Sequence, residues 1–249
     1  MINNISVTIL TKNSEKYLVK CLESVKAFSE IIILDNGSTD RTIEIAQKFT
    51  NTIIIKNDFI GFGPLKNLAA EKASNNWIFS LDSDEIIEES LIRWFKETEL
   101  KGNTVYAFRR KNYYSQKWVK SCGWYPDYVL RLYNRKKTSY LPKLVHESID
   151  VNNMRIERIG HHIFHYTFED VFGLLDKMQR YSELYAEEWK GRKKSSPVKA
   201  VLRAIFSFFR NFFLKKGLFY GYEGFIISIC NSLGVFFKYI KLYEKNRNK

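Results

Sequence analysis

The chain has 249 residues, of which 45% are hydrophobic and 16% aromatic, so it can bury a full core and is neither disordered nor fibrous. Its formal net charge is +13, and residues 190–249 carry 14 lysines and arginines against two glutamates, an excess of +12. A neutral body followed by a basic tail favours an anionic membrane surface as partner and argues against nucleic acid, whose binders usually spread positive charge over the folded body.

Short apolar runs alternate with helix-like patterns over residues 5–81. The run at residues 31–34 is continuously apolar, as is typical of a strand buried on both faces of a parallel sheet. This alternation predicts βαβ units and hence an α/β fold with a Rossmann-like, mostly parallel sheet. Ligands of such sheets bind beyond the carboxyl ends of the strands, so the polar clusters there are expected to share one cleft. The expected strands cover residues 5–10, 31–34, 52–55 and 77–81, and the expected helices cover 15–28, 41–49 and 65–73.

Beyond residue 104 the pattern changes twice. Segments 105–114, 128–133 and 155–166 are β-rich and aromatic, and everything after Phe168 reads as helix. We therefore expect an α/β domain over residues 1–167, with halves at 1–90 and 91–167, and an all-helical region over 168–249.

Two carboxylates, Asp82 and Asp84, directly follow the apolar run at residues 77–81. Mg²⁺ and Mn²⁺ prefer such hard oxygen ligands and keep open positions for diphosphate oxygens. The alternative is an acidic loop that caps the helix expected to begin near Glu88. This motif alone leaves both interpretations open.

Asp35 ends the neighbouring strand, just before Gly37 and Ser38. A tight turn followed by a helix cap would explain the glycine and the hydroxyl residues after it. It does not explain Asp35, whose carboxylate could accept a hydrogen bond from the N–H of a nucleotide base.

In their order and spacing, four motifs resemble those of the family 2 glycosyltransferases of GT-A fold. Further segments at 122–128, 131–133, 145–147 and 165–166 resemble the branch that includes the β-1,4-glucosyltransferases of the lipopolysaccharide inner core. Ser14 departs from the family pattern, because it places Glu15 one residue further from Asn13 than the commoner Asn-Glu pair. The four motifs are Thr11-Lys12-Asn13-Ser14-Glu15, Leu34-Asp35-Asn36-Gly37-Ser38-Thr39-Asp40, Gly61-Phe62-Gly63-Pro64-Leu65-Lys66-Asn67 and Trp77-Ile78-Phe79-Ser80-Leu81-Asp82-Ser83-Asp84-Glu85.

The resemblance implies an inverting, metal-dependent hexosyltransferase. The donor would be UDP-glucose, the cofactor Mg²⁺ or Mn²⁺, and the acceptor a heptose of a membrane-anchored lipopolysaccharide or lipooligosaccharide inner core. In this reading residues 1–90 form the nucleotide-sugar half of the catalytic domain and residues 91–167 the acceptor half.

The resemblance also assigns donor-side roles. Thr11, Glu15 and Asp35 would hold the base and ribose, and Lys66 and Asn67 would line the uridine side of the cleft. The ordinary alternative for Lys66 is a solvated lysine on an exposed helix face.

The metal would be held by the acidic loop. Asp84 would be its direct ligand, while Asp82 would bind the ribose or a metal-bound water, and Ser83 between them would belong to the donor site. His161, His162 or His165 could complete the metal shell, and His165 is the one assigned as a further ligand.

An inverting displacement needs a base that takes the proton of the acceptor hydroxyl. Glu147 and Asp127 are the two candidates, and Glu147 is favoured because it follows a β segment at the position where the resembling relatives carry a Glu-Asp or His-Glu pair. The acceptor is expected to contact Trp124, Tyr125, Arg131 and His146.

The C-terminal region carries a membrane signal. A helix over residues 168–189 is expected to begin after Thr167. At helical spacing, residues 197–214 gather Lys199, Arg203, Ser207, Arg210 and Asn211 on one face and eight large apolar residues on the other, as in helices that lie in a membrane interface. The alternative is an amphipathic helix packed on the catalytic domain. Residues 218–240 are apolar but interrupted by polar residues and glycines, so they are expected to be interfacial or packed.

The expected location is the cytoplasmic face of a bacterial inner membrane, with peripheral attachment. The three cysteines lie far apart without a CxxC pair, and the N-terminus lacks the pattern of a signal peptide. A transferase of the same fold that charges a polyprenyl phosphate, or acts on another cell-envelope glycan, remains the alternative function.

Overall fold

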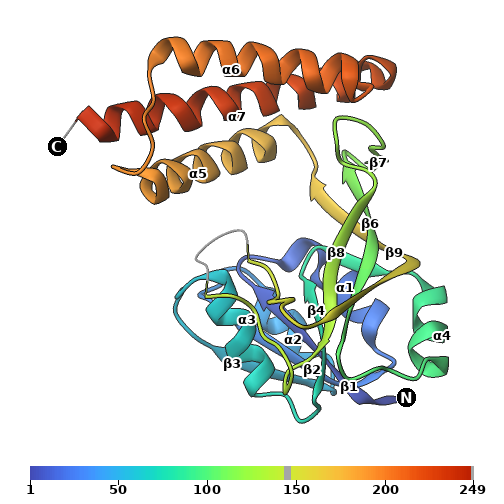
Figure 1. Ribbon diagram of the computed structural model, residues 1–249. Coiled ribbons are helices and arrows are strands. Elements are labelled where there is room, and N and C mark those ends of the chain that lie inside the picture. The colour runs from blue at the N-terminus through green and yellow to red at the C-terminus, as the bar shows by residue number, and fades with distance from the viewer. Residues whose placement is uncertain (143–146, 248–249) are drawn as a thin grey trace. The chain divides into compact units, whose positions relative to one another are not determined.

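The computed structural model describes residues 1–142 and 147–247 (Figure 1). The chain divides into two compact units, which are taken in turn. The first unit combines Met1–Arg110 with Asp127–His165, and the second combines Lys111–Pro126 with Tyr166–Lys249.

The first unit is built on a sheet whose parallel part has the order β3-β2-β1-β4. Strand β8 then pairs antiparallel with β4, and β6 pairs antiparallel with β8. The strands are β1 (Ile2–Thr11), β2 (Phe28–Asp35), β3 (Thr52–Lys56), β4 (Trp77–Asp82), β5 (Glu85–Ile87), β6 (Thr104–Tyr114), β8 (Asp127–Asn134) and β9 (Arg155–Phe168).

Helices cover both faces of this sheet. The helices are α1 (Glu15–Val25), α2 (Thr42–Gln47), α3 (Phe62–Glu71) and α4 (Glu89–Glu97). Alternate residues of the strands separate into two cores: Ile31 and Ile33 pack with α1, α2 and α4, whereas Ile32 and Leu34 pack with α3. The period-two alternation of strand side chains thus explains why the apolar run of β2 is unbroken.

The predicted fold class is confirmed. The fold is α/β with a mostly parallel sheet, as expected for GT-A, and the chain continues after the sheet into C-terminal helices. The largest errors at helix boundaries in this unit are two: α1 ends at Val25 and not at residue 28, where β2 already begins, and α3 begins at Phe62 and not at residue 65. Pro64 lies in its first turn, where an amide N–H has no helical partner to lose, so the proline is tolerated inside the helix. Gly61 precedes the helix with a φ of 107°, a conformation that favours glycine.

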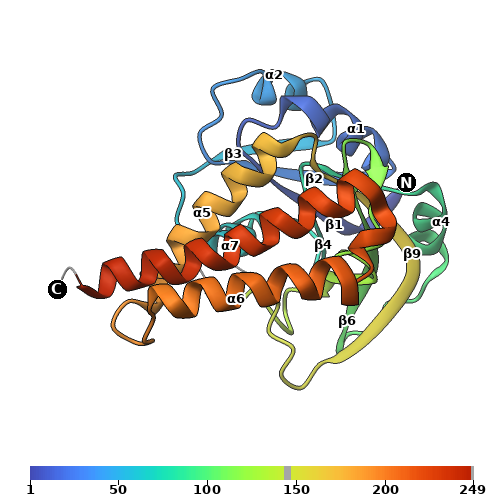
Figure 2. The same cartoon turned by 90° about the horizontal axis from the view of Figure 1, so that it is seen from above.

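The second unit is mainly helical. It contains the short strand β7 (Lys117–Trp118), and α7 (Gly221–Arg247) runs between α5 (Val171–Trp189) and α6 (Pro197–Phe209), as Figures 1 and 2 show. Two short turns connect α6 to α7: the π-helical η1 (Arg210–Leu214) and the 3-10 helix η2 (Gly217–Tyr220).

Two helix boundaries in this unit also differ from the prediction. Helix α5 begins at Val171, because β9 continues to Phe168 and Asp170 is the N-cap, its side chain accepting a hydrogen bond from the Gly173 amide at 3.0 Å. The expected single helix over 197–214 is α6 followed by the wider π turn of η1.

Candidate active site

The carboxyl ends of the parallel strands bring the first site residues together. In the sheet register Thr11 lies opposite Asp35, and Leu10 lies opposite Asp82. Residues that are far apart in the sequence therefore meet at one edge, as the alternation of strands and helices predicted.

Asp35 is buried, and both of its carboxylate oxygens accept hydrogen bonds. Its carboxylate accepts hydrogen bonds from Thr11 Oγ1 at 3.0 Å, from the amides of Gly37 and Ser38 at 3.1 and 2.9 Å, and from Ser38 Oγ. Burial opposes its ionisation, but these hydrogen bonds outweigh it and lower the pKa of Asp35. Asp35 thus organises the turn after β2 as an anion, and contact with a nucleotide base stays a prediction.

The loops after β1, β2 and β4 are tied to one another. Asn13 Oδ1 accepts a hydrogen bond from the Thr39 amide at 2.8 Å, and Glu15 pairs with Arg41 at 3.2 Å. Ser14 Oγ lies 2.8 Å from Ser83 Oγ, so the residue that departs from the family pattern contacts the acidic loop. The extra residue thereby links the predicted base-binding loop to the predicted diphosphate-binding loop.

A network of buried charges surrounds Asp82. Lys66 Nζ donates to Asp82 Oδ1 at 2.8 Å, and the Arg131 guanidinium contacts Asp82 Oδ2. Arg131 also donates to Glu85 at 2.5 Å, and Arg110 lies 3.3 Å from the same carboxylate. Desolvation opposes the charge on Asp82, yet Arg131 and Lys66 hold the pKa of its carboxyl well below the ordinary value.

Lys66 is a buried lysine, only 2% exposed, so the interpretation of a solvated surface lysine is wrong. Its amine reaches three partners: Asp82, Ser80 Oγ at 3.3 Å and Glu147 Oε1 at 4.0 Å. Burial alone would favour the neutral amine, but Asp82 and then Tyr140 raise the pKa of Lys66. A permanent positive charge therefore lies between the acidic loop and Glu147.

Asn67, the next residue of α3, holds the chain that leads to Glu147. Its side-chain amide donates to the Tyr140 carbonyl and accepts from the Tyr140 amide, both at 2.9 Å. The Lys-Asn pair of α3 thus fixes the backbone at Tyr140 through one side chain and contacts Glu147 through the other. The predicted contact of Asn67 with uridine stays a prediction.

Both candidate bases lie on the same charge network. Glu147 is half-buried beside Lys66, and Asp127 accepts a hydrogen bond from Arg110 Nε at 2.8 Å. Arg110 also contacts Glu85, so Asp127 is linked to Asp82 through a chain of ion pairs. Glu147 contacts Lys66, a cation that itself pairs with Asp82.

Asp84 and His165, both predicted as ligands of the divalent cation, lie beside each other. His165 Nε2 lies 3.4 Å from Asp84 Oδ2, because Glu85 of β5 pairs with His165 of β9 in the sheet. A carboxylate suits Mn²⁺ or Mg²⁺ when diphosphate oxygens and waters supply the remaining ligands, and the imidazole would be an additional ligand. Over residues 1–142 and 147–247 no group of three or more His, Cys, Asp or Glu side chains is arranged as a complete metal cage.

The residues predicted to contact the acceptor have different surroundings. Arg131 is buried against Asp82 and Glu85, so its contacts support a role in holding the carboxylates in place. In the second unit, Trp124 packs against Phe168 with ring centroids 5.7 Å apart, and Tyr125 meets Trp118 edge-on at 5.2 Å. His146 lies outside the residues that the structure describes.

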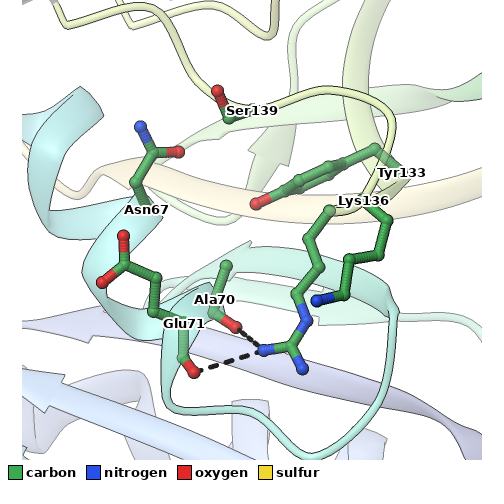
Figure 3. Close-up of a pocket in the computed structure, with 7 residues that line it drawn as sticks. Asn67, Ala70, Glu71, Tyr133, Lys136 and Ser139 are labelled. Atoms are coloured by element: carbon green, nitrogen blue, oxygen red, sulfur yellow. Dashed lines mark hydrogen bonds between the residues drawn. The ribbon is translucent and has the colours of Figure 1, made fainter.

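A pocket of about 360 Å³ lies beside α3 and the chain after β8 (Figure 3). Arg135 lines the pocket and donates to the carbonyls of Ala70 and Glu71 at the end of α3. Neither Asp82, Asp84 nor Glu147 lines it, so it is not the site of the carboxylate chemistry. Its lining residues are Asn67, Ala70, Glu71, Tyr133, Arg135, Lys136 and Ser139.

Sequence reasoning missed Glu85 and Arg110, which complete the charge network. Glu85 directly follows the acidic loop and is 0% exposed, and the change from apolar to basic residues after Phe108 marks Arg110. Their partnership depends on the antiparallel return of β6 and β8, a pairing that the alternation of helices and parallel strands does not predict.

Comparisons with known proteins agree with these motifs. The sequence model of the family described as glycosyl transferase family 2 matches residues 6–164. A lipopolysaccharide core biosynthesis glycosyltransferase, LpsC, of Rhizobium meliloti is 28% identical over 98% of this chain and 94% of its own length. An uncharacterized glycosyltransferase of Rickettsia typhi is 28% identical over 98% of this chain and 89% of its own. Among solved structures, S. aureus TarS 1-349 in complex with UDP-GlcNAc covers 98% of this chain and 89% of its own at 16% identity, with a TM-score of 0.49.

Proposed function

The chain belongs to glycosyl transferase family 2, and we propose that it transfers glucose from UDP-glucose, with inversion, to a heptose of a lipid-linked inner-core glycan. The transferase activity follows from the family. The donor, the acceptor, the stereochemical outcome and the dependence on a divalent cation are the proposal.

The observation that carries the proposal is the position of Lys66 between Asp82 and Glu147. Asp82 ends the strand whose loop continues into Asp84, and Glu147 is the acidic residue expected to act on the acceptor. One buried cation therefore joins the donor-side carboxylate to the candidate base, so the two halves of a single displacement lie within one network of contacts.

In this displacement Glu147 takes the proton of the acceptor hydroxyl, and the hydroxyl oxygen forms a bond to the anomeric carbon. The bond from that carbon to the diphosphate breaks, and the nucleoside diphosphate leaves with the electron pair. Because attack and departure occur on opposite faces, the anomeric configuration inverts. Catalysis by a positioned base contributes typically 10²–10⁴-fold to such a step. The amine of Lys66, 4.0 Å from Glu147 Oε1, would orient this carboxylate toward the acceptor hydroxyl.

Asp84 and His165 would hold the divalent cation. When bound, the cation offsets the negative charge that develops on the leaving diphosphate. Asp82 is committed to Lys66 and Arg131, so we assign it to the ribose side and to the orientation of the acidic loop. Thr11, Glu15 and Ser83 line the loops that would receive the nucleotide.

The lipid-linked acceptor rests on the relative from Rhizobium meliloti, whose name places it in lipopolysaccharide core biosynthesis and which matches this chain nearly end to end. A polyprenyl phosphate would undergo the same displacement through a phosphate oxygen that is already anionic, so it would not need a base. The choice of acceptor is decided by experiment.

The test is a transfer assay with the purified full-length chain and Mn²⁺ or Mg²⁺. UDP-glucose and UDP-N-acetylglucosamine are offered as donors. The acceptors are truncated inner-core lipopolysaccharide that ends in heptose and, separately, a polyprenyl phosphate. We expect glucose on the heptose acceptor, with β configuration by nuclear magnetic resonance. Transfer to the polyprenyl phosphate alone would establish the alternative function, and an α-linked product would overturn the inverting mechanism.

A further inference from the structure

Helix α6 presents its bulkiest apolar side chains to solvent. Leu202 and Phe206 are 62% and 64% exposed, although each could bury most of its surface in a protein core. The exposed positions recur every three or four residues and therefore form one continuous face. We call it the α6 apolar face; it consists of Val198, Val201, Leu202, Ile205, Phe206 and Phe209 of α6, together with Phe213 of η1, which continues the same face.

The opposite face of α6 is made of small and polar residues, and this is the face that packs against α7. Ala200 and Asn211 are buried, and the Ala204 carbonyl accepts a hydrogen bond from Ser232 of α7 at 2.7 Å. A helix of a water-soluble bundle normally buries its large apolar residues and exposes its polar ones. Small residues between helices and large apolar residues facing outwards are instead the pattern of helices in lipid.

The apolar surface continues around the turn into α7. Phe212 of η1 meets Phe225 of α7 at 6.1 Å, and Phe219 of η2 is 78% exposed. The turn is closely packed, since a Cβ on Gly224 would lie 1.9 Å from the Gly217 carbonyl oxygen. The end of the helical hairpin is therefore a fixed apolar surface. The exposed residues that extend it are Leu214, Leu218, Phe219, Tyr222 and Phe225.

The charge of this region has one sign. Residues 197–222 contain five basic residues and no Asp or Glu. Lys199 and Arg203 lie over the ring of Tyr239, with centroid distances of 5.5 and 5.2 Å. Arg210 and Lys216, which border the end of the apolar surface, are exposed. An apolar surface with a basic border complements the acyl chains and headgroups of an anionic membrane.

We propose that the α6 apolar face and its extension around the turn form a membrane-docking surface. In the docked state α6 lies along an anionic bilayer, with its Leu and Phe side chains at the boundary between headgroups and acyl chains and with Arg210 and Lys216 among the phosphates. The proposal rests on exposure and charge within the second unit, so it does not depend on the sugar or the acceptor of the proposed function.

Helix α7 belongs to the same hairpin. By length and composition alone, Gly217–Arg247 could cross a membrane. Of the 18-residue stretch that meets this test, 28% is buried. Its C-terminal end, however, forms ion pairs with α5, through Lys241 to Glu183 at 3.3 Å and Lys245 to Glu183 at 2.7 Å. We therefore place α7 behind α6, as the support on which the docking helix rests.

The test is flotation of the full-length chain with vesicles of phosphatidylcholine, alone or mixed with phosphatidylglycerol, at low and high salt. We expect strong flotation with the anionic vesicles, with weaker but residual binding at high salt, because salt screens charge but leaves apolar burial in place. Arg210→Glu combined with Lys216→Glu should abolish the preference for anionic vesicles.

The decisive variant replaces three residues of the face, Leu202→Ser, Phe206→Ser and Phe209→Ser. It should reduce partitioning at least about tenfold, since each buried large side chain contributes to transfer from water. The matched control is Ile53→Ser with Ile156→Ser, two residues of the first unit that are each 48% exposed, and it should float like the wild type. Circular dichroism and donor hydrolysis without an acceptor confirm that each variant is folded and that the donor site is intact.

Three results would overturn the proposal. The triple variant floats as the wild type does, or the wild type binds neither kind of vesicle. The third such result is that the wild type binds no vesicles but forms a dimer, and that the triple variant is monomeric. A second copy of the chain would then be the occupant of this face. A failed transfer assay leaves each of these readouts unaffected.

Discussion

Lys66 Nζ lies 2.8 Å from Asp82 Oδ1 in the first unit, and the lysine side chain is almost wholly buried. A buried amine needs a compensating anion, and here the anion lies at the carboxyl end of β4, where the donor phosphates are expected. The pair fixes the orientation of the acidic loop before any ligand arrives. Lys66 Nζ also lies 4.0 Å from Glu147, the proposed base, so the same amine would belong to the acceptor side as well.

Replacing Lys66 should therefore impair catalysis more than folding. We expect Lys66→Met to lower kcat by about 10²–10³-fold, the range seen when a positioned electrostatic group is removed. Steady-state kinetics at saturating donor measures the effect. Lys72→Met, at the exposed end of the same helix, is the matched control and should leave kcat unchanged. Near-normal turnover of Lys66→Met would remove this amine from the mechanism.

The assignment of the base is decided by two isosteric variants. Glu147→Gln should lower kcat by roughly 10²–10⁴-fold with unchanged donor affinity, because only the proton acceptor is lost. Asp127→Asn should have the smaller effect, since Asp127 is already bonded to Arg110. Kinetics with truncated lipopolysaccharide, together with calorimetric binding of UDP, separates the two steps. The reverse ranking would make Asp127 the base.

Glu85 should matter chiefly for stability. It is fully buried and accepts hydrogen bonds from Arg131 and from the amide of Asp82. Breaking one partner of a buried ion pair typically costs about 3–5 kcal/mol, and we expect Glu85→Gln to lie near the lower end because Asp82 still pairs with Arg131. Urea unfolding measures the change. Glu23→Gln, which breaks an exposed pair with Lys26, should give no measurable change.

Much of this fold could be predicted from the sequence, because it depends on patterns within short segments of the chain. The apolar run of β2 and the polar residues after it predicted where Asp35 lies, since the ends of parallel strands share one edge. The pairing of Asp84 with His165 could be proposed only from the family resemblance. It depends on the register of β5 against β9, between residues 80 positions apart, which no local pattern specifies. The burial of Lys66 likewise required the surrounding carboxylates and the Tyr140 segment to be placed first.

The sequence predicted the helical period of α6 correctly. It did not identify which face of the helix packs against α7. Ser207 and Asn211 were grouped with the basic residues, whereas Asn211 is buried and bonds to the Ser207 carbonyl at 2.7 Å. Helical spacing defines which residues share a face, but the choice of the face that packs on α7 depends on how closely two backbones can approach.

The lowered pKa of Asp82 makes a prediction about acid stability. A carboxyl whose folded pKa lies below the ordinary 3.8 contributes stability that is complete above that value and is lost as the pH falls through the folded pKa. The wild type should therefore lose unfolding free energy below about pH 4, and Asp82→Asn should lose less over the same interval. Urea titrations between pH 2 and 7 give both curves, with Asp176→Asn, an exposed carboxyl on α5, as the control. Parallel curves for wild type and Asp82→Asn would show that this carboxyl makes no such contribution.

The pairing of Asp84 with His165 leads to a prediction about metal dependence. If these two side chains hold the divalent cation, excess chelator should abolish transfer, and added Mn²⁺ or Mg²⁺ should restore it. Asp84→Asn should lower turnover by orders of magnitude at any metal concentration, because the charged ligand is gone while the fold remains. His165→Asn should instead raise the Mn²⁺ concentration needed for half-maximal activity by about 10–100-fold, with kcat largely recovered at saturating metal. His161→Asn is the control, since that ring bonds to Ser90 and faces Glu88. Full activity of wild type in excess chelator would show that the transfer proceeds without a cation and that Asp84 serves another role.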